Sequence, residues 1–136
     1  MKLHSYLILM VLIVAVSAVA YADVLKEDPK AGHRNGIIVV SWSTLDESGV
    51  KEFKILRRNG TDGDFVLLNV AVTPKGSSSS YEYEDTEAFK ASGGIYQYRI
   101  RVVFTDGSFI DSKITSVSSV ASAARRTWGS IKAMFR

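Results

Sequence analysis

The chain has 136 residues, of which 46% are hydrophobic, and it carries 17 Lys and Arg against 14 Asp and Glu. It has no cysteine and only two histidines, which excludes disulfides and cysteine–histidine zinc sites. The net charge of +3 is small and is not arranged as the basic stripe of a nucleic-acid-binding domain, so we predict no nucleic acid partner.

The first 22 residues have the three parts of a secretory signal peptide. Lys2 supplies the positive charge, an uncharged apolar run covers residues 6–16, and Ala20-Tyr21-Ala22 is a small-x-small cleavage site. The alternative is a membrane anchor, but the run is short because spanning a bilayer takes roughly 20 apolar residues. We therefore predict cleavage after Ala22 and export to the periplasm, the cell surface or the medium.

Residues 23–120 are predicted to form one all-β domain. Apolar and polar side chains alternate at every second position, which is the period of strands with one buried face, and no helical period lies between them. Residues 24–34 are weakly patterned, and Pro29 there suits an edge strand. The other strands are expected over residues 36–42, 50–58, 65–70, 81–85, 95–104 and 109–120, which together describe a small β-sandwich.

Large rings fall on the predicted inner faces of these strands. Trp42, Tyr96 and Tyr98 are expected to carry the core. Asp106-Gly107 predicts a tight hairpin turn, and the serine-rich stretch over residues 74–80 predicts a mobile loop. In the last strand, the expected core contacts are Ile110, Ile114, Val117 and Val120.

Three stretches of this sequence resemble a known family. They are IIVVSWSTLDESGVKEFKILRRNGTDGDF (residues 37–65), YEYEDT (81–86) and GGIYQYRIRVVFTDGSF (93–109). They resemble a variant of the fibronectin type III domain that is common in exported bacterial proteins. The positions that match its pattern are Trp42, Glu47, Phe53, Ile55, Arg57, Gly63 and Phe65.

The resemblance covers residues 36–120 and implies a seven-strand Greek-key sandwich of the fibronectin type III and immunoglobulin-like kind. It implies spacer, adhesion or protein-binding roles and no catalysis. The first strand departs from the family pattern, because no proline-led apolar strand precedes Gly36.

The sequence offers few groups for catalysis or metal binding. His33 is the one histidine after the cleavage site, and we read it as a solvated loop residue because no nucleophile–base pair can be built around it. Asp62 and Asp64 could hold calcium, but two acids in a glycine turn are more typical of turn formation. We therefore predict no catalytic residue, no cofactor, no metal and no small-molecule substrate.

Residues 121–136 change to a helical period. Ala124, Trp128, Ile131 and Phe135 fall on one helical face, and the segment holds four basic residues and no acid. We predict a short basic amphipathic helix. The candidate partner-binding residues are Arg125, Arg126, Trp128, Ile131, Lys132 and Phe135.

A lone helix of this length is marginal in water, so it needs a surface. That surface is the protein's own sandwich, a partner protein such as export machinery that reads the extreme C-terminus, or an anionic membrane. Basic residues near a membrane contribute about 1 kcal/mol each. Ordering each residue costs about 1–2 kcal/mol, so membrane contact would be weak and peripheral.

These observations predict an exported, non-catalytic interaction module of the cell envelope or secreted space. One alternative is a structural or spacer subunit of a surface assembly. A carbohydrate-binding module is a further alternative, but it would show an exposed aromatic platform, and the tyrosines here alternate inward.

Overall fold

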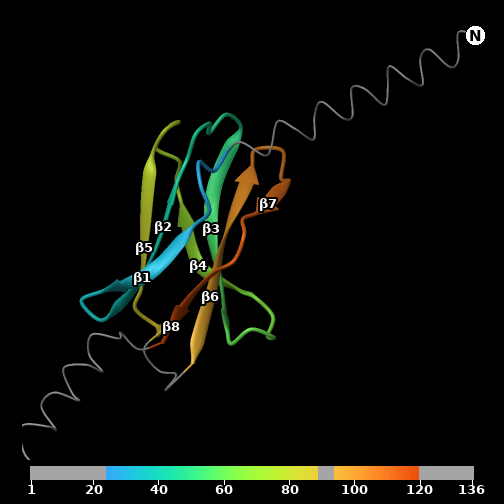
Figure 1. Ribbon diagram of the computed structural model, residues 1–136. Coiled ribbons are helices and arrows are strands. Elements are labelled where there is room, and N and C mark those ends of the chain that lie inside the picture. The colour runs from blue at the N-terminus through green and yellow to red at the C-terminus, as the bar shows by residue number, and fades with distance from the viewer. Residues whose placement is uncertain (1–23, 89–93, 120–136) are drawn as a thin grey trace, which may run out of the picture.

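A computed structural model describes residues 24–88 and 94–119 (Figure 1). These residues form eight strands in two antiparallel sheets and no α-helix, which confirms the predicted all-β, sandwich-like class. No helix within the described ranges is long and apolar enough to cross a membrane. The predicted signal peptide at residues 1–22 and the predicted helix at residues 121–136 lie outside those ranges, as does Val120.

The smaller sheet has the order β1-β2-β5. Its strands are β1 (Lys30–Arg34), β2 (Ile37–Ser43) and β5 (Ser80–Asp85). Asn35 and Gly36 join the first two in a tight hairpin, and both have a positive φ, of 53° and 80°. The first strand of the fold is therefore a short hairpin arm that follows Pro29.

The larger sheet has the order β4-β3-β6-β7, and β8 also pairs with β6. Its strands are β3 (Val50–Asn59), β4 (Val66–Val72), β6 (Ile95–Phe104), β7 (Phe109–Asp111) and β8 (Thr115–Ser118). The bounds of β6 are those predicted from the sequence. The predicted ends of β2, β3, β4 and β5 differ from the structure by at most two residues.

The prediction of one last strand over residues 109–120 is wrong, because the strand is interrupted. Asp111 pairs with Arg101, and Thr115 pairs with Tyr98. Three residues lie between these two pairs on the last strand, but only two lie between them on β6, so the last strand has one extra residue. Ser112 fills the gap, since its Oγ accepts a hydrogen bond from Ile100 N at 2.9 Å. The bulge leaves Ile114 45% exposed, so this predicted core residue is a surface residue.

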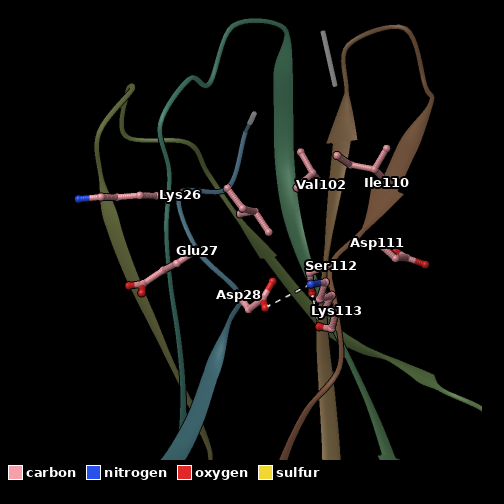
Figure 2. A pocket seen from close by; sticks show the side chains of 9 residues that line it. Lys26, Glu27, Asp28, Val102, Ile110, Asp111, Ser112 and Lys113 are labelled. Carbon is pink, nitrogen blue, oxygen red and sulfur yellow. Dashed lines mark hydrogen bonds and ion pairs between the residues drawn. The ribbon is translucent and has the colours of Figure 1, made fainter. Parts of the chain in front are cut away.

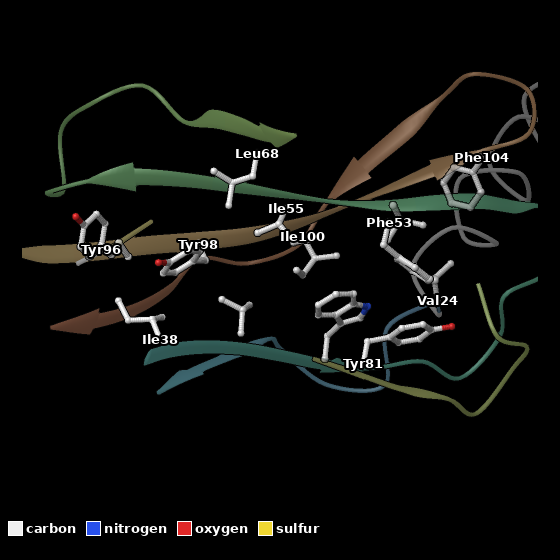
Figure 3. Packing of buried hydrophobic residues seen from close by; sticks show 14 residues of the cluster. Val24, Ile38, Phe53, Ile55, Leu68, Tyr81, Tyr96, Tyr98, Ile100 and Phe104 are labelled. Carbon is white, nitrogen blue, oxygen red and sulfur yellow. The ribbon is translucent and has the colours of Figure 1, made fainter. Parts of the chain in front are cut away.

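The core lies between the two sheets, as the inward alternation predicted (Figure 3). Trp42 stacks on Tyr81 with ring centroids 5.3 Å apart, and Phe53 packs against Tyr81 at 5.0 Å. Tyr96 and Tyr98 are buried, so the predicted core role of the large rings is confirmed. Ile110 and Val117 pack against this core from the interrupted strand.

The described chain enters and leaves the sandwich at opposite ends (Figure 1). Val24 accepts a hydrogen bond from Leu45 N at the end that also holds the β6–β7 turn. Ser119 N bonds to Gly94 O beside the first residue of β6. The length of β6 therefore separates the two points.

Candidate binding surface

A buried ion pair joins the two sheets. Arg57 of β3 donates from Nη1 to both carboxylate oxygens of Asp85 of β5, at 2.8 and 2.7 Å, and the Asp85 side chain is fully buried. Tyr98 of β6 donates its hydroxyl to the same carboxylate at 2.7 Å. Every oxygen of this carboxylate is thus occupied by groups of the fold itself.

The pKa shifts show that these groups are held in one protonation state at neutral pH. Burial, with the hydrogen bond to Asp85, raises the pKa of Tyr98 well above its usual value. Burial alone would lower the pKa of Arg57, but the hydrogen bond and the charge of Asp85 outweigh it, and that pKa is raised. At neutral pH Tyr98 is therefore protonated and Arg57 is charged.

A second buried carboxylate, Glu47, anchors the serine-rich loop. It accepts hydrogen bonds from Tyr81 OH at 2.5 Å, Thr44 Oγ1 at 2.7 Å and Gly76 N at 2.8 Å. Ser77 Oγ in turn accepts the Glu47 N–H at 3.0 Å. The loop over residues 74–80 is therefore tied to the sandwich, contrary to the mobility predicted from its composition.

The remaining candidate groups have structural partners or lie open to solvent. Glu82 and Glu84 lie on the solvent side of β5, and each pairs with Arg34 at 2.9 Å. His33 was expected in a solvated loop but lies in β1, where its Nε2 donates to Ser118 O at 2.8 Å. No group of three or more acidic, histidine or cysteine side chains within residues 24–88 and 94–119 could hold a metal ion.

The outer face of the larger sheet gathers arginines over phenylalanine rings. The guanidinium carbons of Arg58 and Arg99 lie 4.6 and 4.3 Å from the ring centroid of Phe65. That of Arg101 lies 3.9 Å from the ring centroid of Phe109. We call these five residues the arginine–phenylalanine face.

Strand alternation explains why this face exists. Phe53, Ile55 and Arg57 point into the core, so Leu56 and Arg58 point outward from β3. Leu56 pairs with Leu67 on one side and with Arg99 on the other, and it is buried although it is not part of the central core. The outer face thus has an apolar base beneath its cations.

Asp111 fixes part of the arginine–phenylalanine face. It accepts two hydrogen bonds from Arg101, at 2.7 and 2.9 Å, and lies 3.6 Å from Arg99. The hydrogen bond from Arg101 lowers the pKa of Asp111, and the same bond raises the pKa of Arg101. The Nε of Arg99 is buried without a hydrogen-bond partner within the described part of the chain.

A groove of about 340 Å³ lies between the segment that precedes β1 and the strands β6 and β7 (Figure 2). Val102 and Ile110 form its apolar side, and an ion pair of 3.8 Å between Asp28 and Lys113 crosses it. Its lining contains lysines and carboxylates but no histidine or other base paired with a nucleophile.

The partner-binding residues predicted from the sequence lie in residues 121–136, outside the described ranges, so their role stays a prediction. The sequence analysis did not predict the arginine–phenylalanine face. The available signal was that three outward arginines share one sheet with Phe65 and Phe109, which do not follow the inward alternation.

Comparisons with known proteins support the fold class. No known family model and no curated protein matches the chain. Two crystal structures of the pectate lyase Pel3 from Pectobacterium carotovorum resemble it, with TM-scores of 0.52 and 0.50 at 17% and 20% sequence identity. These matches cover 67% and 66% of this chain but only 26% and 25% of the lyase. The chain therefore spans about a quarter of the lyase's length, and the similarity is one of fold.

Proposed function

We propose that this protein is an exported, non-catalytic binding module with a fibronectin type III-like fold. The strand order supports the family assignment. The chain crosses from one sheet to the other three times, between β2 and β3, between β4 and β5, and between β5 and β6, as in a Greek-key sandwich. The eighth strand arises from the bulge at Ser112, which divides the seventh strand of such a domain in two.

The arginine–phenylalanine face is the observation that carries the binding role. Arginine and aromatic residues are enriched in protein interfaces, where they supply a large share of the binding energy. Stacking on Phe65 holds Arg58 and Arg99 in place before a partner arrives, which lowers the entropy lost on binding. The fixed charges within the fold, by contrast, offer no acid–base pair for a reaction.

The basic segment of residues 121–136 is the second proposed contact. Its residues Arg125, Arg126, Trp128, Ile131, Lys132 and Phe135 combine positive charge with apolar bulk. We propose a protein partner, including export machinery, as its main target, with weak peripheral contact to anionic membranes as a lesser one.

A crosslinking pull-down with the full mature chain tests the role of the face. The double variant Arg58→Ala/Arg99→Ala should lose the captured partner. The matched control Lys30→Ala/Arg34→Ala removes the same charge from the opposite sheet and should retain it. Equal capture by both variants, each shown to fold by its melting temperature, would overturn the assignment of this face.

Carbohydrate binding is the competing proposal, and the ring geometry speaks against it. Sugars stack on open aromatic faces, but two arginines, Arg58 and Arg99, lie over the ring of Phe65. A glycan array should therefore give no hits. Pectate belongs on that array because the structural neighbours are pectate lyases, and specific retention of pectate would favour the carbohydrate proposal over ours.

A further inference from the structure

We infer that strand β4 is a pairing edge through which two copies of this chain join. Within the described residues, β4 pairs only with β3, so its other side is free. Its seven residues, VLLNVAV, contain no charge, no proline and no glycine. A long apolar edge strand of this kind readily pairs with another strand.

The other three sheet edges carry the usual protections. β1 has Lys30 and Arg34, and its His33 bonds to Ser118 of β8. β5 presents Glu82 and Glu84. β7 has only three residues, and its Asp111 is engaged by Arg101. β8 lies at the same edge as β7, has four residues, and is the strand whose Ser118 bonds to His33. Among the edge strands of the described residues, β4 alone lacks both charge and cover, which marks it as the edge that is free to pair.

Two side chains of β4 are exposed to an extent that the single chain does not explain. Val66 is 63% exposed, and Leu67 is 46% exposed although it pairs with the buried Leu56 of β3. Leu68, Val70 and Val72 point toward the core, and Leu67, Asn69 and Ala71 point away from it. A partner strand would cover Val66 and Leu67 and extend both faces of the sheet.

The sequence of β4 indicates that the partner is a second copy. It reads nearly the same in both directions about Asn69, so an antiparallel pair centred there is self-complementary. Val66 then faces the partner's Val72, Leu67 faces the partner's Ala71, and Leu68 faces the partner's Val70. Each inward residue meets an inward residue, and the two Asn69 amides meet on the solvent side, where they can bond to each other.

The irregular pairing of β4 with β3 limits how strongly two copies can pair through β4. Leu67 pairs with Leu56, and Ala71 pairs with Lys54. The two pairs are four residues apart along β4 but only two apart along β3, so β4 bows opposite Ile55. The alternation of faces is preserved, but the bow limits flat pairing. We therefore expect a reversible dimer, and because the contact is two-fold symmetric it closes on itself and does not grow into a fibre.

Single cysteines test the pairing directly, since the chain has none of its own. In the full mature chain under mild oxidation, Asn69→Cys should form a disulfide dimer, because residues opposite each other in antiparallel strands lie within disulfide reach. Ser80→Cys, exposed on the edge strand of the other sheet, is the matched control and should stay monomeric. Leu67→Cys should crosslink far better to Ala71→Cys than to itself, which fixes the register.

Sedimentation of the unmodified protein provides the second measurement. Dimer should appear as concentration rises and should be lost in Leu67→Lys. Leu45→Lys, at an equally exposed leucine away from β4, should leave it unchanged. The inference is overturned by a monomer at every concentration, by equal crosslinking of Ser80→Cys and Asn69→Cys, or by crosslinks of Asn69→Cys to a different protein alone.

Discussion

The two-residue period of the strands puts the charged side chains of Arg57 and Asp85 on the inner faces of the sheets, just as it does the aromatic rings. Arg57 follows Phe53 and Ile55 at the same spacing, and Asp85 follows Tyr81 in the same way. Both therefore lie on inner faces, and they meet there. Removing one partner of a buried ion pair is costly because the other is left without compensation.

Asp85→Asn should consequently lower the free energy of unfolding by about 3 kcal/mol, the lower end for a buried pair because Arg57 is 21% exposed. Glu82→Gln breaks a pair on the outer face, where both side chains are about half exposed, and should cost about 1 kcal/mol or less. Urea denaturation of the two variants measures the difference. Equal losses would show that the buried pair does not stabilise the fold.

The raised pKa of Tyr98 predicts that the folded protein loses stability at alkaline pH. Its pKa is raised in the folded protein, while an unfolded tyrosine titrates near about 10. The unfolded chain therefore loses this proton first, so the stabilisation is complete below about pH 10 and falls as the pH rises above it. The variant Tyr98→Phe has no hydroxyl to ionise, so its stability lacks this pH dependence. The difference in the free energy of unfolding between the unmodified protein and the variant, measured by denaturation, should therefore shrink as the pH rises. A deficit that stays constant would contradict the assignment.

At the scale of elements, alternation predicted which segments are strands but not where they are interrupted. The bounds of β6 follow from five inward residues in an unbroken row. The break between β7 and β8 depends on one extra residue and on Ser112 taking the place of a backbone acceptor, and alternation carries no sign of either. The exposed position of Ile114 follows from that break.

The serine-rich loop was misjudged for a related reason. Composition indicated that residues 74–80 bury nothing, yet their backbone groups bond to Glu47 and Thr44, which come from a distant turn. The candidate face was missed likewise, because its contacts join β3, β6, β7 and the β3–β4 turn. Contacts between elements far apart in sequence are set by the packing of the sheets, which a local pattern does not contain.

Glu47→Ala should release the loop. The hydroxyl of Tyr81 and the amide of Gly76 lose their shared acceptor, which costs about 1–3 kcal/mol where the donors stay buried. Hydrogen exchange at the Gly76 amide should become faster. Asp106→Ala removes a turn carboxylate that bonds to Ser108 in the β6–β7 turn, away from the serine-rich loop, so it serves as the control and should leave the Gly76 amide protected.

At the scale of the whole molecule, the sandwich of residues 24–119 holds its own core, with rings from both sheets packed against each other. We therefore expect it to be stable without the basic segment that follows. The sequence left an anionic membrane as a weak possibility for that segment and two stronger ones, which are packing on the protein's own sandwich and contact with a partner protein.

Deletion of residues 122–136 separates these two possibilities. An unchanged melting temperature with loss of the captured partner is the expected result, because the segment then contributes to recognition and not to the core. A large fall in melting temperature would show instead that the segment packs on the sandwich. The substitution of Trp128 and Phe135 by alanine in the full chain should reproduce the loss of capture.

The opposite placement of the two ends of the described chain has a mechanical consequence. A pull applied at Val24 and Ser119 would act along the strands, so the hydrogen bonds of each ladder would be loaded together in shear instead of being peeled apart one at a time. A domain arranged in this way resists stretching. It would keep whatever precedes it and whatever follows it about 30 Å apart, the length of a ten-residue strand such as β6.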